Sequence, residues 1–468
     1  MEKFDFAVIG GGSAGYAAAA EAARSGLKTV CVEGGKEVGG LCILRGCMPS
    51  KTLIESANRF LTLRRAKEFG LSAGGIGFDP RAMIERKRRL IDEFAKYRVK
   101  QLNGGRFEFL RGRAEFADAH RITLKLLAGG EKQFEAATVL ISTGSVINLI
   151  DLPGLVETEY LDSDAVLQCE RVPRSVAVLG GGAIALEFAH FYSALGVGVT
   201  VVQRSGQVLK DADPDVVEAL TSALRNRGVQ IICDTKLIRA ERSANGKRVL
   251  YEKNGAEHYV EADEILYALG RKPAVRGLGL ENAGVETEKS GAIAVNDRMQ
   301  TSQAHIFAAG DVTGLFEIVH IAIQQGELAA RNVLRLLKAE PLIPIDYRLK
   351  MFVMFPEPQL ALLGLTEREA ANRGLEVRAA RYPFNDHGKS MIRGETEGFV
   401  KLIVEAKNGE IVGAAVVGPE ASELIHEITV AMNFRSTAAT LASIPHYHPT
   451  LSEIWTYPAA ELAQSLGH

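Results

Sequence analysis

Residues 4–33, FDFAVIGGGSAGYAAAAEAARSGLKTVCVE, decide the fold. The apolar segment Phe4–Ile9 predicts a buried strand, and the alanine-rich segment Tyr16–Ser25 predicts a helix after a glycine-rich turn. Lys28–Val32 predicts a second strand, which Glu33 ends. A strand, a G-x-G-x-x-G turn, a helix, a second strand and an acidic residue, in this order, are typical of a dinucleotide-binding βαβ unit.

The glycines of this turn have a chemical purpose. They let the backbone approach a pyrophosphate at the N-terminus of the helix, where the helix dipole favours an anion. The acidic residue after the second strand can accept hydrogen bonds from the hydroxyls of a ribose. The residues of this unit predicted to bind a dinucleotide are Gly10, Gly12, Ser13, Ala14, Gly15 and Glu33.

A second copy of the pattern begins at Ser175. Ser175–Leu179 predicts a strand, a turn and a helix follow it, and Val199–Val202 predicts the next strand. The residues of this second turn predicted to bind a nucleotide are Gly180, Gly182 and Ala185. Two dinucleotide sites in one chain imply electron transfer.

Each unit closes with an apolar strand that ends in glycine, Thr138–Gly144 in the first and Glu264–Gly270 in the second. A hairpin precedes the second closure, because Asn254-Gly255 separates two alternating segments. A later segment, His305–Asp311, places an acidic residue just after a buried strand. These strand ends add the predicted cofactor-binding residues Thr143, Gly144, Gly270, Gly310 and Asp311.

The chain after the Pro341–Pro344 linker predicts a third domain, of α+β type. Met351–Gly364 predicts a strand. Phe399–Val404 and Ile411–Val417 predict a hairpin around an Asn-Gly turn, and Ala421–Met432 predicts an amphipathic helix.

The composition is that of an ordinary globular protein, with 468 residues, 47% hydrophobic residues and a net charge of -2. At roughly 150 residues per domain, this length predicts about three domains. The 55 Lys and Arg against 57 Asp and Glu leave no concentrated basic face for nucleic acid. The N-terminus shows no secretory signal, and no apolar run approaches the ~18 residues of a membrane span. We therefore expect a cytoplasmic protein without membrane or nucleic-acid partners, and the sequence predicts no metal site.

Cys42 and Cys47 form the one close pair among five cysteines, which are too few and too scattered for a disulfide scaffold. Residues five apart on a regular helix rise about 7.5 Å, whereas the Cα atoms of a disulfide lie roughly 4.4 to 6.8 Å apart. If the sulfurs pair, the segment must be distorted, and Gly46 permits this. Pro49 fits the first turn of a continuing helix, whose dipole favours a thiolate at Cys47. The alternative is a pair of buried structural thiols, the role expected for Cys31, Cys169 and Cys233.

The chain resembles the flavoprotein disulfide reductases, the group that contains dihydrolipoamide dehydrogenase, glutathione reductase and mercuric reductase. The most specific likeness lies in Gly-Gly-x-Cys-x4-Cys-x-Pro-Ser-Lys at residues 39–51 and His-Pro-Thr-Leu-Ser-Glu at residues 448–453. The resemblance covers nearly the whole chain. It implies an α/β fold with two Rossmann-like dinucleotide-binding domains, for FAD and NAD(P), and a C-terminal α+β dimerisation domain.

The resemblance also implies where the cofactors and domains lie. FAD belongs to the first glycine turn, with Glu33 on the adenosine ribose, Asp311 on the ribitol side, and Gly40 and Lys51 as further contacts. NAD(P)H belongs to the second turn. The predicted domains are an FAD-binding domain at 1–149, an NAD(P)-binding domain at 150–272, a return segment completing the FAD domain at 273–344, and a dimerisation domain at 345–468.

The same resemblance implies a path for the electrons. Hydride passes between nicotinamide and flavin, electrons pass between flavin and the Cys42–Cys47 disulfide, and a small dithiol or disulfide substrate exchanges with the outer thiol. Cys47 is implied to face the flavin, and Cys42 to be the interchange thiol. A thiol with a pKa of about 8.5 needs a base at neutral pH, and His448, oriented by Glu453, is the implied acid and base. This histidine serves the disulfide of the partner subunit, which requires a homodimer.

Lys51 and Glu187 match the ion pair that the family places near the flavin N5 edge. A positive charge there stabilises the reduced, anionic flavin. If the pair is buried, removing one member costs about 3 to 5 kcal/mol, because the other charge is left unpaired.

The second nucleotide site departs from the dihydrolipoamide dehydrogenase pattern. Gln203 stands where an acidic residue normally selects NAD by binding the ribose 2'-hydroxyl. Arg204 and Lys210 fall where glutathione reductase carries two basic residues that hold a 2'-phosphate, which favours NADPH. The alternative is that both are solvent-facing charges, so the choice between NADH and NADPH stays open.

The electron acceptor is also open. Ala183 stands where glutathione reductase has a tyrosine, residues 463–468 lack the cysteine pair of mercuric reductase, and Phe355–Pro358 does not match dihydrolipoamide dehydrogenase closely. The best match is a dihydrolipoamide dehydrogenase-like NAD(P)H:disulfide oxidoreductase with a lipoamide-like substrate. The alternatives are an NADPH-dependent reductase of another disulfide or a metal ion, a flavin-containing redox sensor or assembly subunit, and a thiol-free flavin oxidase, which leaves the cysteine pair unexplained.

Overall fold

The computed structural model describes residues 1–467, and His468, the last residue of the predicted dimerisation domain, lies outside them. The chain divides into two compact units. The first contains residues 1–50, 85–149 and 270–346, and the second contains residues 51–84, 150–269 and 347–468. The domain limits expected at residues 149, 272 and 344 stay a prediction.

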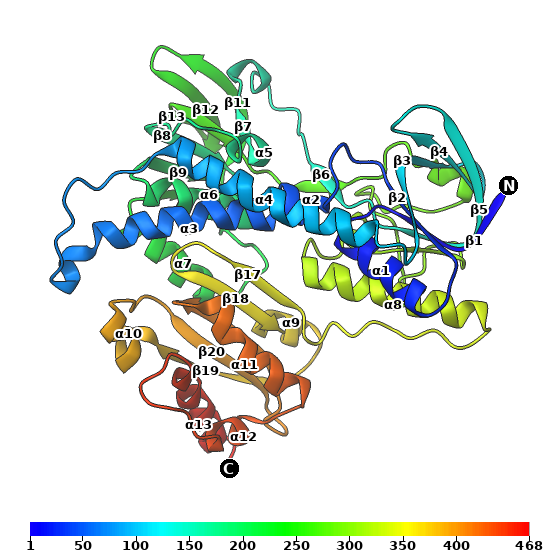
Figure 1. The fold of residues 1–468 in the computed structure, drawn as a ribbon. Helices are drawn as coiled ribbons and strands as arrows, with labels where there is room; N and C mark the ends of the chain where they lie inside the picture. Colours follow the sequence, from blue (N-terminus) through cyan, green and yellow to red (C-terminus); the bar gives the residue numbers. More distant parts are fainter. Residues whose placement is uncertain (468) are drawn as a thin grey trace. The chain divides into compact units, whose positions relative to one another are not determined.

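The first unit is built on a six-stranded sheet (Figure 1). Its strands are β1 (Glu2–Ile9), β2 (Thr29–Glu33), β3 (Glu108–Phe116), β4 (Arg121–Leu126), β5 (Glu131–Ile141) and β16 (Ile306–Ala308). β1 pairs in parallel with β2 and β5, β2 pairs with β3, and β5 pairs with β16. β3, β4 and β5 also form an antiparallel meander. The apolar segments predicted around the first glycine turn are therefore the central parallel strands, whose two faces are both covered.

Two helices pack side by side on this sheet, α1 (Ser13–Arg24) and α8 (Val319–Leu337) (Figure 1). Gly326 of α8 lies directly against Ala14 of α1, where a Cβ atom would come within 2.2 Å of the Ala14 carbonyl oxygen. The small residues of α1 thus allow the close approach that fixes the first glycine turn. The next helices along the chain are α2 (Gly40–Leu44), α3 (Cys47–Arg64) and α4 (Pro80–Leu102).

The second unit contains a parallel sheet in the order β10-β9-β8-β14-β7. Its strands are β7 (Leu161–Asp162), β8 (Ser175–Leu179), β9 (Gly198–Val202), β10 (Gln230–Ile232) and β14 (Glu264–Tyr267). α6 (Ala183–Ala194) packs on β8 and β9, and α7 (Pro214–Asn226) packs on β10. The second strand–turn–helix–strand pattern is therefore confirmed as a βαβ unit.

A three-stranded antiparallel sheet extends this region, formed by β11 (Lys236–Ser243), β12 (Gly246–Lys253) and β13 (Ala256–Ala262). Asn254 and Gly255 join the last two strands with φ angles of 54° and 76°. Positive φ at both positions is what a tight two-residue hairpin turn requires, so the hairpin prediction is confirmed.

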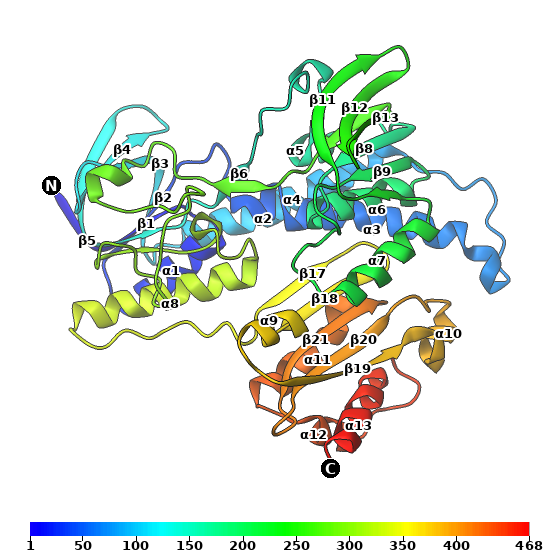
Figure 2. The same ribbon diagram turned by 180° about the vertical axis from the view of Figure 1, so that it is seen from behind.

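The last sheet is antiparallel, in the order β17-β18-β21-β20-β19, and Figure 2 shows these strands next to one another. They are β17 (Met351–Met354), β18 (Gln359–Gly364), β19 (Val377–Pro383), β20 (Phe399–Glu405) and β21 (Ile411–Gly418). The accompanying helices are α11 (Ala421–Asn433), α12 (Ala438–Ser443) and α13 (Thr456–Ser465), with the short helices α9 (Glu367–Asn372) and α10 (Gly388–Arg393) before them and α5 (Ser163–Val166) earlier in the unit. The predicted hairpin and amphipathic helix of the α+β region are confirmed.

Three strand predictions were wrong in extent. The single strand expected over Met351–Gly364 is two antiparallel strands, β17 and β18, because Pro356 and Pro358 lack the N–H groups that a continuing strand needs. The strands expected to reach Gly144 and Gly270 end at Ile141 and Tyr267. These two glycines have φ angles of 73° and 98°, which turn the chain out of the sheet.

After those turns, β6 (Ser145–Ile147) and β15 (Arg271–Pro273) pair as an antiparallel ribbon. The predicted fold class is confirmed, with two parallel-sheet βαβ regions and a C-terminal α+β region. Within residues 1–467, no helix combines the length and apolar character needed to cross a membrane.

Candidate functional site

The first glycine turn is shaped to receive a ligand at the N-terminus of α1. Gly10 has a φ of 111°, and a Cβ atom on Gly15 would lie 1.7 Å from the Gly10 carbonyl oxygen. Gly12 is the N-cap residue, and within residues 1–467 no side chain caps the helix start. Ser13 and Ala14 form the first turn of α1. Backbone N–H groups at this end are therefore available to an anion such as a pyrophosphate.

Glu33 lies at the mouth of this turn, at the end of β2. Its carboxylate accepts hydrogen bonds from the backbone N–H groups of Gly11, at 3.0 Å, and Gly35, at 2.6 Å. Gly40 also packs on the turn, since a Cβ atom on it would lie 2.7 Å from the Gly12 Cα atom. The carboxylate is thus held at the position expected for a ribose-binding group.

The strand ends β5 and β16 bring further predicted residues to the first unit's site. The Thr143 hydroxyl is buried and has no hydrogen-bond partner among residues 1–467, as expected if a bound group completes its bonding. Asp311 follows Gly310, whose N–H donates to Gln325 Oε1 at 2.7 Å. The Asp311 carboxylate accepts a hydrogen bond of 2.6 Å from the Ser145 hydroxyl. An uncapped helix start and an orphaned buried hydroxyl fit FAD, which the first-unit residues would hold by its pyrophosphate and ribitol.

The second glycine turn repeats this geometry at α6. Gly180 has a φ of 112°, and a Cβ atom there would lie 2.4 Å from the Ala268 carbonyl oxygen. Gly182 is the N-cap residue without a side-chain cap among residues 1–467, and open space surrounds the position of its missing Cβ. Ala185 is fully buried in the first turn of the helix. The open, uncapped turn fits the pyrophosphate of NAD(P).

The residues after β9 differ from those after β2. Gln203 is half-buried, and its side-chain amide donates weakly to the Gln207 carbonyl at 3.4 Å. Arg204 and Lys210 are exposed. Within residues 1–467 neither side chain forms an ion pair, so both positive charges remain available to a ligand phosphate.

Cys42 and Cys47 flank a break between two helices. Cys42 belongs to the five-residue helix α2, the chain leaves helical geometry at Arg45 (φ -144°), and α3 begins at Cys47. A Cβ atom on Gly46 would lie 3.3 Å from the Cys42 Cα atom, so glycine allows the two ends to approach. The predicted distortion of this segment is confirmed.

The helix dipole acts on Cys47, because this residue begins the 18-residue helix α3. Pro49 lies in the first turn, as predicted, and the Ser50 hydroxyl donates to the Gly46 carbonyl at 2.8 Å. Cys42 and Cys47 are both half-buried residues. By contrast, burial raises the pKa of the Cys31 and Cys233 thiols and keeps them protonated.

Arg98 is a positive group near Cys42 that the sequence did not single out. Its guanidinium stacks on the Tyr16 ring at 4.2 Å. Burial lowers the pKa of Arg98, while the electrostatic effects of Tyr16 and Cys42 raise it. A cation in this position favours the thiolate form of the cysteine.

Lys51 and Glu187 form the predicted ion pair. Lys51 Nζ lies 2.8 Å from each oxygen of the Glu187 carboxylate, which is 5% exposed. Phe355 joins them, because its N–H donates to Glu187 Oε1 at 3.2 Å and its ring centre lies 5.0 Å from Lys51 Nζ. The sequence showed Phe355 only as part of a poorly matching segment, since the contact joins the residue after β17 to a residue of helix α6 far away in the chain.

His448 and Glu453 are also brought together. His448 Nδ1 lies 2.9 Å from Glu453 Oε2 and 3.2 Å from Oε1. The His448 side chain is 75% exposed, whereas that of Glu453 is 10% exposed. A fixed carboxylate therefore holds an imidazole whose other nitrogen is open to a substrate.

A second histidine at this carboxylate was missed by sequence reasoning. His387 is fully buried, and its Nε2 lies 3.5 Å from Glu453 Oε1. No motif surrounds His387, so its place beside Glu453 depends on the tertiary fold alone.

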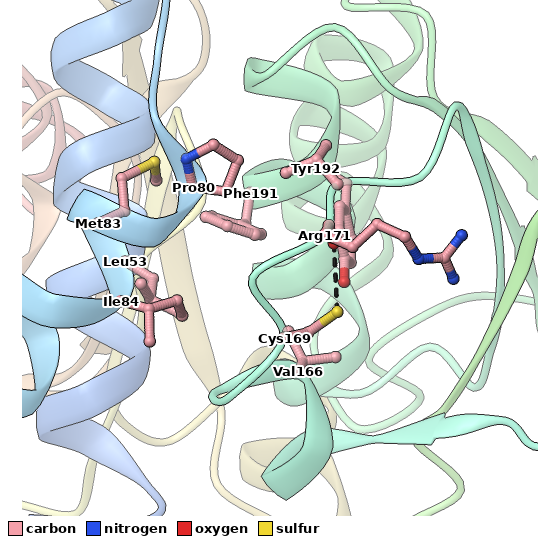
Figure 3. A pocket seen from close by; sticks show the side chains of 10 residues that line it. Leu53, Pro80, Met83, Ile84, Val166, Cys169, Arg171, Phe191 and Tyr192 are labelled. Carbon is pink, nitrogen blue, oxygen red and sulfur yellow. Dashed lines mark hydrogen bonds between the residues drawn. The ribbon is translucent and has the colours of Figure 1, made fainter.

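A separate cavity in the second unit is too small to hold a substrate. It has a volume of about 10 Å³, which is room for a single water molecule. Figure 3 shows the Cys169 Sγ atom at its wall, donating to the Arg171 carbonyl at 3.2 Å, with Met83 and Phe191 opposite. The Cys169 thiol thus lies among mainly apolar side chains that line this small cavity.

Comparison with known protein families agrees with this geometry. Residues 4–326 match the family described as pyridine nucleotide-disulphide oxidoreductase. Residues 352–459 match the dimerisation domain of the same family. The chain thus carries both the nucleotide-binding and the dimerisation regions of the family, as a homodimeric enzyme requires.

Curated relatives match over nearly their full length. Dihydrolipoyl dehydrogenase from Geobacillus stearothermophilus is 33% identical over 458 residues, covering 97% of this chain and 95% of that protein. Dihydrolipoyl dehydrogenase from Mycobacterium bovis is 35% identical over 454 residues, covering 97% of each chain.

Solved structures show the same fold. LpdA from Mycobacterium tuberculosis has a TM-score of 0.88 at 28% identity, covering 99% of this chain and 100% of that one. The Cu(II) complex of RclA, an HOCl-induced flavoprotein disulfide reductase from Escherichia coli, has a TM-score of 0.85 at 26% identity, covering 98% and 100%. The resemblance inferred from the two motifs is confirmed: the chain belongs to the FAD- and NAD(P)-dependent pyridine nucleotide-disulphide oxidoreductases.

Proposed function

We propose that the chain is a dihydrolipoamide dehydrogenase-like enzyme that exchanges electrons between NAD(P)H and a small dithiol or disulfide substrate. The observation that carries the proposal is the His448–Glu453 pair, an exposed imidazole held at 2.9 Å by a buried carboxylate. Such a pair supplies the proton transfers of thiol–disulfide exchange. The 33–35% identical dihydrolipoyl dehydrogenases support a lipoamide-like substrate.

In the proposed cycle the cysteines exchange disulfide bonds with the substrate. A substrate thiolate attacks Cys42 Sγ, a new disulfide forms there, and the Cys42–Cys47 bond breaks with Cys47 leaving as the thiolate. His448 of the partner subunit then takes the proton of the second substrate thiol. That sulfur closes the substrate disulfide and releases Cys42, so two electrons now reside on the cysteine pair. Bound FAD supplies two-electron transfer between this pair and the nicotinamide.

The remaining residues prepare these steps. The N-terminus of α3 favours the Cys47 thiolate, and the Arg98 guanidinium favours the Cys42 thiolate. In the proposal, Lys51, held by Glu187, places a positive charge beside the flavin. Each group thus stabilises negative charge at a different point of the electron path.

A Cys42→Ser variant tests the proposal, with Cys169→Ser as the matched control. We expect Cys42→Ser to lose lipoamide-dependent turnover while retaining bound FAD, because the serine hydroxyl cannot form a mixed disulfide. Cys169→Ser should keep turnover, since Cys169 lies at the wall of the small cavity. Full turnover in Cys42→Ser refutes the disulfide mechanism. Undiminished biological function without turnover instead favours a redox sensor or assembly subunit.

A second candidate function is an NADPH-dependent reductase of another disulfide or of a metal ion. The exposed, unpaired Arg204 and Lys210 side chains favour it within the described part of the chain, residues 1–467. RclA, a flavoprotein disulfide reductase with a solved structure as a Cu(II) complex, is similar to this chain. The two candidates are separated by measuring turnover with NADH and with NADPH, each combined with lipoamide, glutathione disulfide or Cu(II). The highest kcat/KM with lipoamide supports the first candidate. The highest kcat/KM with NADPH and either of the other acceptors supports the second.

A further inference from the structure

The Glu453 carboxylate faces two imidazoles. Its Oε1 atom accepts from His448 Nδ1 at 3.2 Å and lies 3.5 Å from His387 Nε2. The two histidines differ sharply in environment, since the His448 side chain is 75% exposed and that of His387 is 0% exposed. One carboxylate is therefore shared between a solvent-facing histidine and a fully buried one.

The Glu453 carboxylate favours a proton on Nε2 of His387, because a carboxylate can only accept, and Ser390 can complete this tautomer by donating to Nδ1. The Ser390 Oγ atom lies 2.9 Å from His387 Nδ1, and both side chains are buried. When the hydroxyl donates to Nδ1, the neutral imidazole carries its proton on Nε2. Among residues 1–467, Nε2 has no hydrogen-bond partner within normal geometry. A buried N–H without a partner is costly, and the Glu453 Oε1 atom lies 3.5 Å from Nε2.

Burial favours the neutral form of His387. Burial has the largest effect and lowers the pKa of His387, the Glu453 carboxylate and a hydrogen bond with the Thr450 backbone raise it, and His448 lowers it, with a net lowering. The other titratable neighbours are Tyr457, whose ring centre lies 6.5 Å from that of His387, and the adjacent Asp386, whose carboxylate accepts from Tyr382. Two imidazolium ions on one carboxylate repel each other, so the proton of catalysis belongs on the exposed His448.

We propose that His387 is a positioning residue, a neutral Nε2–H donor that fixes the Glu453 carboxylate for His448. The proposal rests on the proposed function, in which His448 and Glu453 supply the acid and base. When the Nε2–H group of His387 holds the Glu453 carboxylate in place, His448 keeps its proton on Nδ1 and its Nε2 faces the substrate. Ser390 belongs to the same arrangement, because its hydroxyl donates to Nδ1 when the His387 proton is on Nε2.

Three variants of the FAD-loaded dimer test this role. His387→Leu removes the N–H donor, and His387→Asn keeps an N–H group near Glu453. Ser390→Ala removes the hydroxyl that hydrogen-bonds to His387 Nδ1, so that the proton of His387 is no longer held on Nε2. The readouts are the pH–rate profile of lipoamide-dependent turnover and, separately, flavin reduction by NAD(P)H in a single turnover. Reduction of the flavin by NAD(P)H needs no proton transfer by His448. It therefore reports whether each variant is folded and contains FAD.

We expect His387→Leu to lower kcat about 10-fold, a fraction of the 10²- to 10⁴-fold that general acid–base catalysis contributes. The midpoint of its pH–rate profile should move by at least about half a pH unit. His387→Asn should recover most of the rate and the original midpoint. Ser390→Ala should have a rate and a midpoint between those of the unmodified enzyme and those of His387→Leu. Flavin reduction should be unchanged in all three variants.

His448→Ala distinguishes failure of this inference from failure of the proposed function. If His448→Ala abolishes turnover and His387→Leu leaves both the rate and the profile unchanged, His387 only packs the core and the positioning role is refuted. If His448→Ala also has no effect, the proposed acid–base pair is wrong. If His387→Leu does not fold, an unshifted profile in Ser390→Ala refutes the positioning role.

Discussion

The two glycine-rich turns share a backbone geometry and differ in what surrounds it. Gly10 and Gly180 have φ angles of 111° and 112°, and a Cβ atom on either would lie 2.4 Å from the carbonyl oxygen of the residue that follows the neighbouring strand. Gly12 and Gly182 both begin their helices without a side-chain cap among residues 1–467. This shared cradle explains why both turns suit a pyrophosphate.

The turns diverge at their third small residue and at the end of the second strand. Gly15 has no room for a methyl group, whereas Ala185 carries one in a fully buried position. The Glu33 carboxylate binds the backbone N–H of Gly11, while Gln203 packs its neutral amide against Gly181. The shared backbone geometry suits a dinucleotide, and we expect the residue after the second strand to determine which ribose is bound.

The largest effect should be a loss of FAD when a methyl group is added at the third small residue of the first turn. The second turn has room for this methyl group, whereas the first does not. Gly15→Ala places a Cβ atom 1.7 Å from the Gly10 carbonyl oxygen, and both atoms belong to a rigid turn. We expect the purified variant to hold less than about a tenth of the normal FAD, because overpacking forces the backbone apart. The ratio of flavin to protein absorbance measures this.

The reciprocal variant Ala185→Gly is the control for the second turn. It removes a methyl group that the turn already accommodates, so we expect NAD(P)H affinity to change less than about 3-fold. Normal FAD content in Gly15→Ala contradicts the difference drawn between the two turns.

The next effect concerns the basic residues beside the second turn. Arg204→Ala combined with Lys210→Ala should raise the KM for NADPH about 100-fold, since each contact to a 2'-phosphate contributes roughly 1 to 1.5 kcal/mol. The KM for NADH should change less than about 2-fold, because NADH lacks that phosphate. Steady-state kinetics with both nucleotides measures the effect.

Arg225→Ala is the matched control for lost surface charge. Arg225 is an exposed residue of α7 whose guanidinium lies 3.8 Å from the Glu218 carboxylate. It should leave both KM values unchanged. Equal losses for NADH and NADPH in the double variant mean that Arg204 and Lys210 act through general electrostatics only.

The smallest effect should come from making the second turn resemble the first. Gln203→Glu restores a carboxylate that accepts from the ribose 2'-hydroxyl and repels a 2'-phosphate. We expect the ratio of kcat/KM for NADH to that for NADPH to rise about 10-fold. An unchanged ratio shows that residue 203 does not contact the ribose.

Sequence patterns predicted the parts of this molecule that depend on local spacing. The two glycine turns, the Asn254-Gly255 hairpin and the five-residue step from His448 to Glu453 are all short-range features, and each has the expected geometry. The Lys51–Glu187 ion pair was predicted from the family resemblance, because its members are far apart in the chain.

The rest required the tertiary structure. His387 lies between η5 (Phe384–Asp386) and α10, whereas Glu453 lies in η6 (Ser452–Trp455) after α12, and only the tertiary fold brings the two side chains together. Phe355 meets Glu187 through the end of β17, in a segment whose two prolines hid the break between two strands. Neither contact leaves a periodic or spaced signal, because packing partners distant in the chain are chosen by shape.

The central claim is that nucleotide electrons reach the Cys42–Cys47 pair by way of FAD. Anaerobic stopped-flow reduction of the FAD-loaded protein, with NADH and NADPH in separate mixings, tests it most directly. We predict that loss of the flavin absorbance is followed by a long-wavelength band from charge transfer between the Cys47 thiolate and the flavin. Flavin bleaching without that band under either nucleotide would contradict the role assigned to the cysteine pair.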